Sequence, residues 1–343
     1  MLKWYQKTEE SHDVFVAERV RLVRNLAHEP FPVKLSEEEG KALLGRMERG
    51  METLRDETGA AFSVLEMPEL GDTEKQALKE RRAINGAGAM KKGPERLLLS
   101  ADESESLLLN GEDHIRIQCI GSGTGLEALW KEADRLDDAV NEQFPYAFHE
   151  KYGYLTAYPT NVGTGLRAGV TLHLPLLSVG KQFGKLVNEI GRFGVSVRGL
   201  YGDGAENYGA LYEVSNQKTL GVSEAEILSL VQQMADRLAG NERKMKTMTL
   251  KNHRLDMEDE VFKSYGVLKY AKKLSVKEAM IYLSQVRVGE TEGLLEFRSP
   301  MNFYGLMLEI QQANLELLAP EADRGDLKKA RADHIRKRLP ELV

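Results

Sequence analysis

The amino-acid sequence predicts an α+β fold, with an antiparallel β-sheet flanked by helices and an all-helical C-terminal domain after it. Two observations support this. Residues 60–120 read mostly as β, with short apolar runs separated by turn-forming segments, as in a meander of antiparallel strands. From Ser223 to Val343 nearly every segment has helical periodicity instead. We therefore expect two domains, 1–255 and 256–343, with their junction around 257–266.

The composition is that of an ordinary globular protein. The chain has 343 residues, with 53 acidic against 47 Lys and Arg residues, which is long enough for a substantial core and gives no support for nucleic-acid binding. The N-terminus lacks the apolar stretch of a signal peptide, and no run approaches membrane-spanning length. The single cysteine, Cys119, excludes an internal disulfide and a cysteine-based zinc site. A cytoplasmic location follows as the default expectation.

In the first third of the chain, local signals place one helix and one hairpin. Ser36 and Glu39 form a capping box for a helix that runs to about Arg55. Two leucine runs, 97–99 and 107–109, are separated by a polar connection at 100–104, which predicts a hairpin within the meander.

A glycine-rich turn at 121–125 then opens a second helix, with Thr124 and Glu127 as its capping box. A dinucleotide site is the alternative for this turn. The spacing is not G-x-G-x-x-G and the preceding segment alternates, so a tight connection is favoured. The buried stripe of this helix is expected to comprise Leu126, Leu129, Trp130, Ala133, Leu136 and Val140.

The middle of the chain alternates strands and helices. Residues 170–174, 195–200 and 211–215 have the pattern of strands, and 183–193 has apolar residues spaced for one helical face. An acidic, glycine-containing loop lies at 201–206. Further capping boxes, at Ser223 with Glu226 and at Ser275 with Glu278, begin helices of the last third.

The stretch 110–116 carries charged residues at the start of a predicted strand. Glu112 and Asp113 precede a segment in which Arg116 alternates with apolar residues, which predicts a half-buried strand with charge on one face. Other arginines lie beside predicted strands or glycine-containing turns. A fold that brings the ends of these strands together would place several guanidinium groups around one polyanion, such as a triphosphate. Solvated charges and ordinary surface ion pairs are the alternative. These further arginines are Arg19, Arg21, Arg167 and Arg198.

Five motifs, in order, resemble those of the phosphagen (ATP:guanido) kinase superfamily, and within it the branch of bacterial protein-arginine kinases. They are the segments 19–21, 111–118, 154–156 together with 159–168, 198–202 and 215–217. The segments 262–268 and 277–280 also resemble the helical C-terminal domain of that branch. In the small-molecule guanidino kinases a helical domain precedes the first arginine pair, whereas here that pair is Arg19 and Arg21 and the helical extension follows.

The resemblance implies a nucleotide site and a pair of carboxylates. Glu112 matches the general base that takes a proton from the acceptor guanidinium, and Asp203, with Glu206 nearby, matches the carboxylate that grips it from a mobile loop. ATP and Mg²⁺ are the implied cofactors, with no protein side chain assigned to the metal. The nucleotide-binding positions are Ala17, Glu18, Arg19, Val20, Arg21, Arg82, Arg116, Arg167, Ala168, Gly169, Val170, Thr171, Arg198, Gly199, Leu200, Tyr201, Gly202 and Asp203.

The sequence departs from the family pattern at several of these positions. Ala17 and Glu18 stand where small hydroxyl residues are usual, and Arg82 stands where a histidine is expected against the adenine. Gly111 replaces a carboxylate and Asp203 is shorter than the usual Glu, which puts metal binding in doubt. Tyr158 replaces a reactive cysteine. Segment 325–330 lacks both arginines of the family's allosteric phosphoarginine pocket, and a solvated basic helix is the simpler interpretation there.

The implied activity is ATP-dependent phosphorylation of arginine side chains in proteins. A kinase of free arginine or another small guanidino compound is one alternative, and a catalytically weakened adaptor that holds nucleotide or clients for a protease is another. The resemblance further implies a homodimer, protein substrates with exposed arginines, an activator protein and an AAA+ protease as partners. Neither nucleic acid nor a membrane is expected as a partner.

Overall fold

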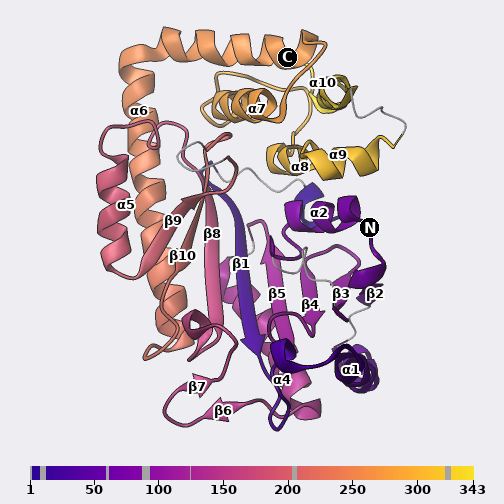
Figure 1. The fold of residues 1–343 in the computed structure, drawn as a ribbon. Helices are drawn as coiled ribbons and strands as arrows, with labels where there is room; N and C mark the ends of the chain where they lie inside the picture. Colours follow the sequence, from indigo (N-terminus) through magenta and orange to yellow (C-terminus); the bar gives the residue numbers. More distant parts are fainter. Residues whose placement is uncertain are drawn as a thin grey trace. The chain divides into compact units, whose positions relative to one another are not determined.

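The computed structural model describes residues 2–7, 13–58, 62–86, 93–123, 125–202, 207–320 and 326–343, and for 51–58 the backbone alone. The predicted antiparallel sheet is confirmed, with eight strands in the order β2-β3-β4-β5-β1-β8-β10-β9 (Figure 1). The strands are β1 Phe15–Arg24, β2 Phe62–Glu66, β3 Arg96–Ser100, β4 Glu105–Leu109, β5 Ile115–Gly121, β8 Leu166–His173, β9 Val195–Gly199 and β10 Leu211–Asn216, with a separate pair β6 Phe148–His149 and β7 Gly153–Tyr154.

Helices make up most of the remaining described structure. None of those in the described part of the chain has a stretch long and apolar enough to cross a membrane. The helices are α1 Glu37–Thr58, α2 Asp72–Glu80, α4 Leu126–Gln143, α5 Phe183–Arg192, α6 Glu224–Tyr270, α7 Val276–Thr291, α8 Phe303–Glu309, α9 Gln312–Leu318 and α10 Leu327–Arg338.

The chain folds into two compact units, each assembled from several stretches of sequence. Unit 1 comprises Met1–Trp4, Glu18–Gly169 and Ser215–Val231, and unit 2 comprises Tyr5–Ala17, Val170–Val214 and Gln232–Val343. The expected boundary between residues 255 and 256 falls inside α6, close to His253, where the backbone leaves helical geometry (φ −139°, ψ 37°). The division into domains at 255 stays a prediction.

In unit 1, α4 packs against β5 and α1. Its predicted stripe is buried as expected, except that Trp130 is only half-buried. The helix begins after Gly125, which has φ +81° and therefore favours glycine. Thr124, its predicted capping residue, lies outside the described residues.

Unit 1 also contains a helix, α2, that the sequence analysis missed. Residues 60–120 were expected to be mostly β, but α2 and the segment after it cover the leucine-rich face of β3 and β4. Their buried cluster comprises Met67, Leu78, Ala83, Ile84, Leu97, Leu99 and Leu108. Ala83 and Ile84 belong to this cluster, so the segment 82–85 is packed onto the sheet through it.

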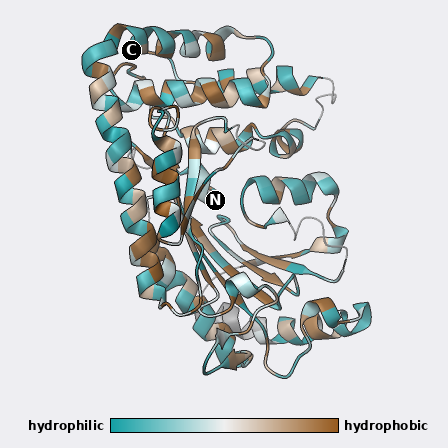
Figure 2. Cartoon of the chain, turned by 60° about the vertical axis from the view of Figure 1, so that its left-hand side comes forward, coloured by the Kyte–Doolittle hydropathy of each residue, from teal (hydrophilic) through white to brown (hydrophobic). Residues whose placement is uncertain are grey.

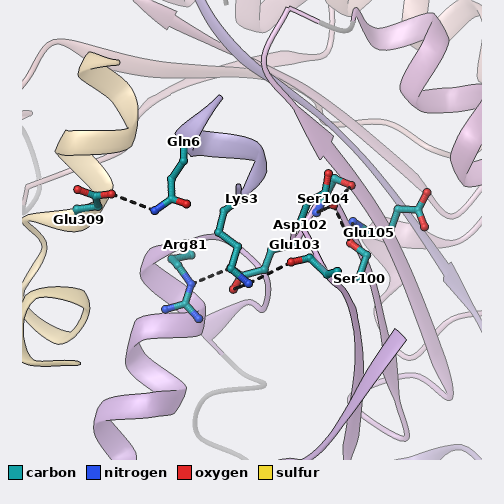
Figure 3. A network of polar contacts seen from close by, with 10 residues as sticks. Lys3, Gln6, Arg81, Ser100, Asp102, Glu103, Ser104, Glu105 and Glu309 are labelled. Carbon is teal, nitrogen blue, oxygen red and sulfur yellow. Dashed lines mark hydrogen bonds and ion pairs between the residues drawn. The ribbon is translucent and has the colours of Figure 1, made fainter. Parts of the chain in front are cut away.

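The predicted hairpin between β3 and β4 is confirmed, and its turn is held by polar side chains (Figure 3). The Asp102 carboxylate accepts hydrogen bonds from the hydroxyl groups of Ser100 (3.1 Å) and Ser104 (2.6 Å). Glu103, with φ 60°, pairs its buried carboxylate with Lys3 (3.1 Å) and Arg81 (2.8 Å). The turn therefore fixes the pairing of the two strands.

Unit 2 contains β9 and the first four residues of β10, with α5 packed against β9, and the helices α7 to α10, which pack against one another. The predicted capping box of α7 is confirmed, because Ser275 and Glu278 each accept a hydrogen bond from the backbone N–H of the other. The long helix α6 carries hydrophilic and hydrophobic residues along its length (Figure 2). The segment 257–266, expected as a junction, is continuous helix within α6.

Candidate active site

Four polar side chains of unit 1 share one face of the sheet. β1 and β5 pair antiparallel, with Arg21 opposite Gln118 and Val23 opposite Arg116. Opposite residues in a pair, and residues two apart in a strand, face the same side. Arg19, Arg21, Arg116 and Gln118 therefore lie on one face, and the core residues Ile117 and Cys119 lie on the other.

β5 was expected to be half-buried, but all seven of its residues are buried. Helix α4 packs against this strand, and Gln118 donates a hydrogen bond to the carbonyl of Arg82 (2.7 Å) in the segment that crosses its charged face. Arg116 keeps only 9% of its surface exposed. Its position on a strand covered on both faces explains this burial.

Arg116 lies among like charges. Burial lowers its pKa well below the ordinary value, and the charges of Arg21 and Arg19 lower it further. The carboxylates of Glu112 and Glu95 act in the opposite direction without cancelling the shift. The charge of the Arg116 guanidinium is thus unfavourable where it stands, and a bound anion would relieve its repulsion with Arg21 and Arg19.

Arg21 and Arg116 line a cavity of about 120 Å³ that also has carboxylates in its wall. The cavity thus presents both signs of charge within unit 1. Its lining comprises Arg21, Val23, Asn85, Glu95, Leu108, Gly111, Glu112, Asp113, Arg116 and Asn161.

Glu112 lies in the turn between β4 and β5, and hydrogen bonds hold both oxygens of its carboxylate. The hydroxyl of Tyr158 donates to Oε1 (2.9 Å), and the amide of Asn85 donates to Oε2 (3.3 Å). The side chain is half-buried and reaches the cavity. A carboxylate placed in this way can accept a proton or bind a cationic group.

The residues after Glu112 fix the turn. The buried Asp113 carboxylate accepts hydrogen bonds from the Asn25 amide (2.6 Å) and the Ala157 backbone N–H (2.6 Å). Burial raises the pKa of Asp113, although these two bonds lower it. His114 accepts from the backbone N–H of Leu26 (3.1 Å). The turn is therefore tied to the end of β1 and to the segment that carries Tyr158.

Gly111 stands next to Glu112, at a position where the family resemblance led us to expect a carboxylate. A Cβ atom added to Gly111 would lie 2.9 Å from Oε1 of Glu95 and 3.3 Å from Cδ2 of Leu108. Glu95 is 1% exposed and lies directly before β3. The space beside Gly111 is thus filled by a different carboxylate.

Arg167 lies near the start of β8, the strand next to β1 in the sheet order. Its guanidinium donates to the backbone carbonyl of Asn216. The side chain of Asn216 accepts from the backbone N–H of Ala168 (2.9 Å) and donates to the carbonyl of Leu166 (3.0 Å). One buried asparagine therefore fixes the backbone on both sides of Arg167.

Several other predicted site residues are not among those that line this cavity. The register places the side chains of Glu18 and Val20 on the sheet face opposite Arg19. Arg82 approaches the site through its carbonyl and has φ 67°. Gly169 is buried in β8 of unit 1, whereas Asp203 and Glu206 lie outside the described residues. Unit 2 contains Ala17, Val170, Thr171, Arg198, Gly199, Leu200, Tyr201 and Gly202.

Three residues of this arrangement escaped the sequence analysis, namely Asn25, Asn85 and Glu95. The first two are single asparagines in connecting segments, and their contacts with Asp113 and Glu112 span 88 and 27 residues. Glu95 follows Pro94 and is separated from the leucine run 97–99 by Arg96 alone. A carboxylate directly before such a buried strand is the one signal that could have revealed it.

The described residues contain no group of three or more His, Cys, Asp or Glu side chains placed to hold a metal ion. The face of the sheet that carries Arg19, Arg21 and Arg116, here called the arginine face, by contrast has a charge suited to the phosphates of a nucleotide, because Arg21 and the buried Arg116 both line the cavity.

Comparison with known proteins decides the family. A family model described as the ATP:guanido phosphotransferase C-terminal catalytic domain matches residues 45–245. The chain belongs to this family. A second model, the protein-arginine kinase McsB C-terminal domain, matches residues 254–342. The ATP:guanido phosphotransferases are enzymes that use ATP with a divalent metal.

The chain is also similar over most of its length to curated proteins named protein-arginine kinase. One from Caldanaerobacter subterraneus subsp. tengcongensis is 38% identical over 304 residues, covering 89% of this chain and 90% of the relative. One from Clostridium novyi is 36% identical over 316 residues, covering 92% of each chain.

Solved structures of guanidino kinases share the fold. The duplicated taurocyamine kinase from Schistosoma mansoni with bound transition state analog components has a TM-score of 0.59 at 20% identity, covering 71% of this chain and 36% of that chain. Lombricine kinase has a TM-score of 0.59 at 19% identity, covering 70% and 69%.

Proposed function

We propose that this chain transfers the γ-phosphoryl group of ATP to the guanidinium of arginine side chains in proteins. The observation that carries the proposal is the cavity in which Arg21 and Arg116 stand beside Glu112. Similarity over about nine-tenths of the chain to protein-arginine kinases supports a protein as the acceptor.

In this reaction the Oβ–Pγ bond of ATP breaks and a bond forms between phosphorus and a guanidinium nitrogen. The nitrogen loses a proton, which Glu112 accepts as general base. Arg19, Arg21 and Arg116 hold the phosphates and offset the negative charge of the transferring group. The protein contributes positioning and charge rather than covalent chemistry.

The remaining parts of the site are proposed by family resemblance. Mg²⁺ would accompany ATP, held mainly by phosphate oxygens and water, with the chemical task of neutralising phosphate charge. Arg167 and Arg198 would complete the phosphate contacts. Asp203, with Glu206 close by in sequence, would bind the acceptor guanidinium as the second carboxylate.

We also propose the division of the chain into a catalytic domain, 1–255, and a helical domain, 256–343, which matches the order of the two family models. A cytoplasmic homodimer that works with an activator protein and an AAA+ protease is the family-based expectation. Client proteins would be recognised through exposed arginines.

The test is to incubate the chain with ATP, Mg²⁺ and an unfolded arginine-rich protein, with free arginine in a parallel reaction. Mass spectrometry under conditions that preserve N–P bonds would detect acid-labile phosphoarginine in the protein and little product from free arginine. Glu112→Gln should lower the rate at least 100-fold. Glu127→Gln, at an exposed position of α4, is the matched control and should match wild type.

Two outcomes would contradict the proposal. Efficient turnover of free arginine with an unmodified protein would indicate a small-molecule guanidino kinase. Equal ATP turnover by wild type and Glu112→Gln would indicate a nucleotide- or client-binding protein instead.

A further inference from the structure

The carboxylate of Glu112 is held by two residues that come from different parts of unit 1. Tyr158 lies 46 residues after it and Asn85 lies 27 residues before it. We propose that Tyr158 and Asn85 are positioning residues, which hold the two carboxylate oxygens of Glu112 in the orientation that the reaction needs. This inference rests on the proposed function, because it assigns a task to residues around the proposed base.

The backbone that carries Tyr158 is fixed relative to Glu112. Ala157, the residue before it, donates its backbone N–H to the Asp113 carboxylate (2.6 Å), directly beside Glu112 in the chain. The carbonyl of Tyr158 accepts from the hydroxyl of Thr156 (2.8 Å) and from the backbone N–H of Asn161 (3.0 Å). The phenol therefore has a defined place although 48% of the residue is exposed.

The hydrogen bond keeps Tyr158 in its donating form. The bond to Glu112 and the charge of that carboxylate raise the pKa of the Tyr158 hydroxyl above 10.0. The phenol thus stays protonated and donates at neutral pH.

Two donors do not block the carboxylate. Each carboxylate oxygen has two lone-pair sites, so Oε1 and Oε2 each keep one free site after accepting from Tyr158 and Asn85. An arriving guanidinium, with its planar fork of N–H groups, can use these remaining sites. Tyr158 and Asn85 would then fix the plane and distance of the carboxylate before substrate binds. Misplacement of a reacting group by about 1 Å costs up to roughly 100-fold in rate.

The first experiment needs no activity. Tyrosine labelled with ¹³C at Cζ is followed by NMR against pH in wild type and in Glu112→Gln, with Tyr158→Phe assigning the resonance among the 12 tyrosines. Loss of the carboxylate should lower the pKa of Tyr158 towards its ordinary value. An unchanged titration of Tyr158 would overturn the proposal whatever the chain catalyses.

The second experiment is a double-mutant cycle on the phosphorylation rate. Tyr158→Phe should lower kcat about tenfold with a smaller change in KM for the protein substrate. In Glu112→Asp, whose shorter side chain withdraws from the phenol, the same substitution should cost less than twofold. Tyr152→Phe, an exposed tyrosine six residues away, is the control and should have no effect in either background.

Equal losses from Tyr158→Phe in the two backgrounds would show that Tyr158 acts independently of Glu112 and would overturn the proposal. Asn85→Ala should also lower kcat. An unchanged kcat would show that Asn85 is not a positioning residue. A wild-type chain without arginine kinase activity would refute the proposed function, while the NMR titration would still decide whether Tyr158 and Glu112 are linked.

Discussion

The carboxylate oxygen Oε1 of Glu95 lies 2.9 Å from the point where Gly111 would carry a Cβ atom. Glu95 is buried at 1% exposure, so its side chain has little room to move away. The space beside Gly111 is therefore occupied by a carboxylate from 16 positions earlier in the chain. A Cβ atom at position 111 therefore requires the Glu95 carboxylate to shift.

Gly111→Ala should therefore lower the free energy of unfolding by about 1–3 kcal/mol, as overpacking does in other cores. Glu95→Ala makes room, so Gly111→Ala should cost much less in that background, and urea unfolding of the four proteins measures the coupling. Gly45→Ala is the control, because a Cβ at Gly45 meets nothing within 4 Å and alanine favours helix. Equal costs in the two backgrounds would contradict the pairing of Gly111 with Glu95.

Local signals in the sequence were sufficient for much of the fold. The leucine runs predicted the two strands of the β3–β4 hairpin. The polar segment between them predicted its turn, because that turn is stabilised by residues only two apart, such as Asp102 and Ser104. The capping boxes at Ser36, Ser223 and Ser275 begin α1, α6 and α7 because each closes within three residues. Such contacts are encoded in neighbouring positions.

The features that the sequence did not show depend on distant partners. Helix α2 buries only Ala77 and Leu78, too few residues for a visible helical period. The charged face of β5 is covered by the segment around Arg82, 36 residues from Gln118. The hydrogen bond from Tyr158 to Glu112 joins residues 46 positions apart, so no local pattern in the sequence could reveal it.

If the arginine face binds the phosphates of ATP, then ATP should raise the free energy of unfolding. ATP binding should stabilise wild type by about 2.7 kcal/mol at a concentration 100 times Kd. Arg116→Met should abolish most of this gain, because it removes a buried phosphate partner. Thermal unfolding with and without ATP measures the difference.

Without ATP the Arg116→Met variant should be at least as stable as wild type, because burial and the charges of Arg21 and Arg19 disfavour its guanidinium. Arg46→Met, which breaks a surface ion pair with Glu29, is the matched control and should keep the full ATP effect. An undiminished ATP effect in Arg116→Met would exclude this residue from the nucleotide site.

A buried ion pair anchors the end of β1 in unit 1. Arg24 is 2% exposed, and Asp137 on α4 accepts from its Nη2 (2.7 Å) and Nε (3.0 Å). Asp137→Asn should lower the free energy of unfolding by about 3 kcal/mol, because it leaves the Arg24 charge buried without its carboxylate. Chemical unfolding measures this cost. Asp138→Asn, at the exposed neighbouring position, should change stability by less than about 0.5 kcal/mol.

An ion pair within unit 2 predicts a pH dependence of stability. Asp13 accepts from Nη2 (2.7 Å) and Nε (2.8 Å) of Arg243, and this bond lowers the pKa of Asp13 below 3.8. A carboxylate whose pKa is lower in the folded state stabilises the protein at pH values above its unfolded pKa. This contribution disappears as the pH falls below 3.8 and through the folded pKa, where Asp13 becomes protonated in both states.

Asp13→Asn should accordingly lower the free energy of unfolding at pH 7 by about 0.5 kcal/mol, because the pair is partly exposed and solvent screens it. At pH 2 the variant and wild type should differ much less. Urea unfolding at both pH values, with Arg243→Met and the double variant completing a cycle, isolates the pair from other titrating groups. A difference of the same size at both pH values would show that Asp13 contributes through packing and that its charge has no part in it.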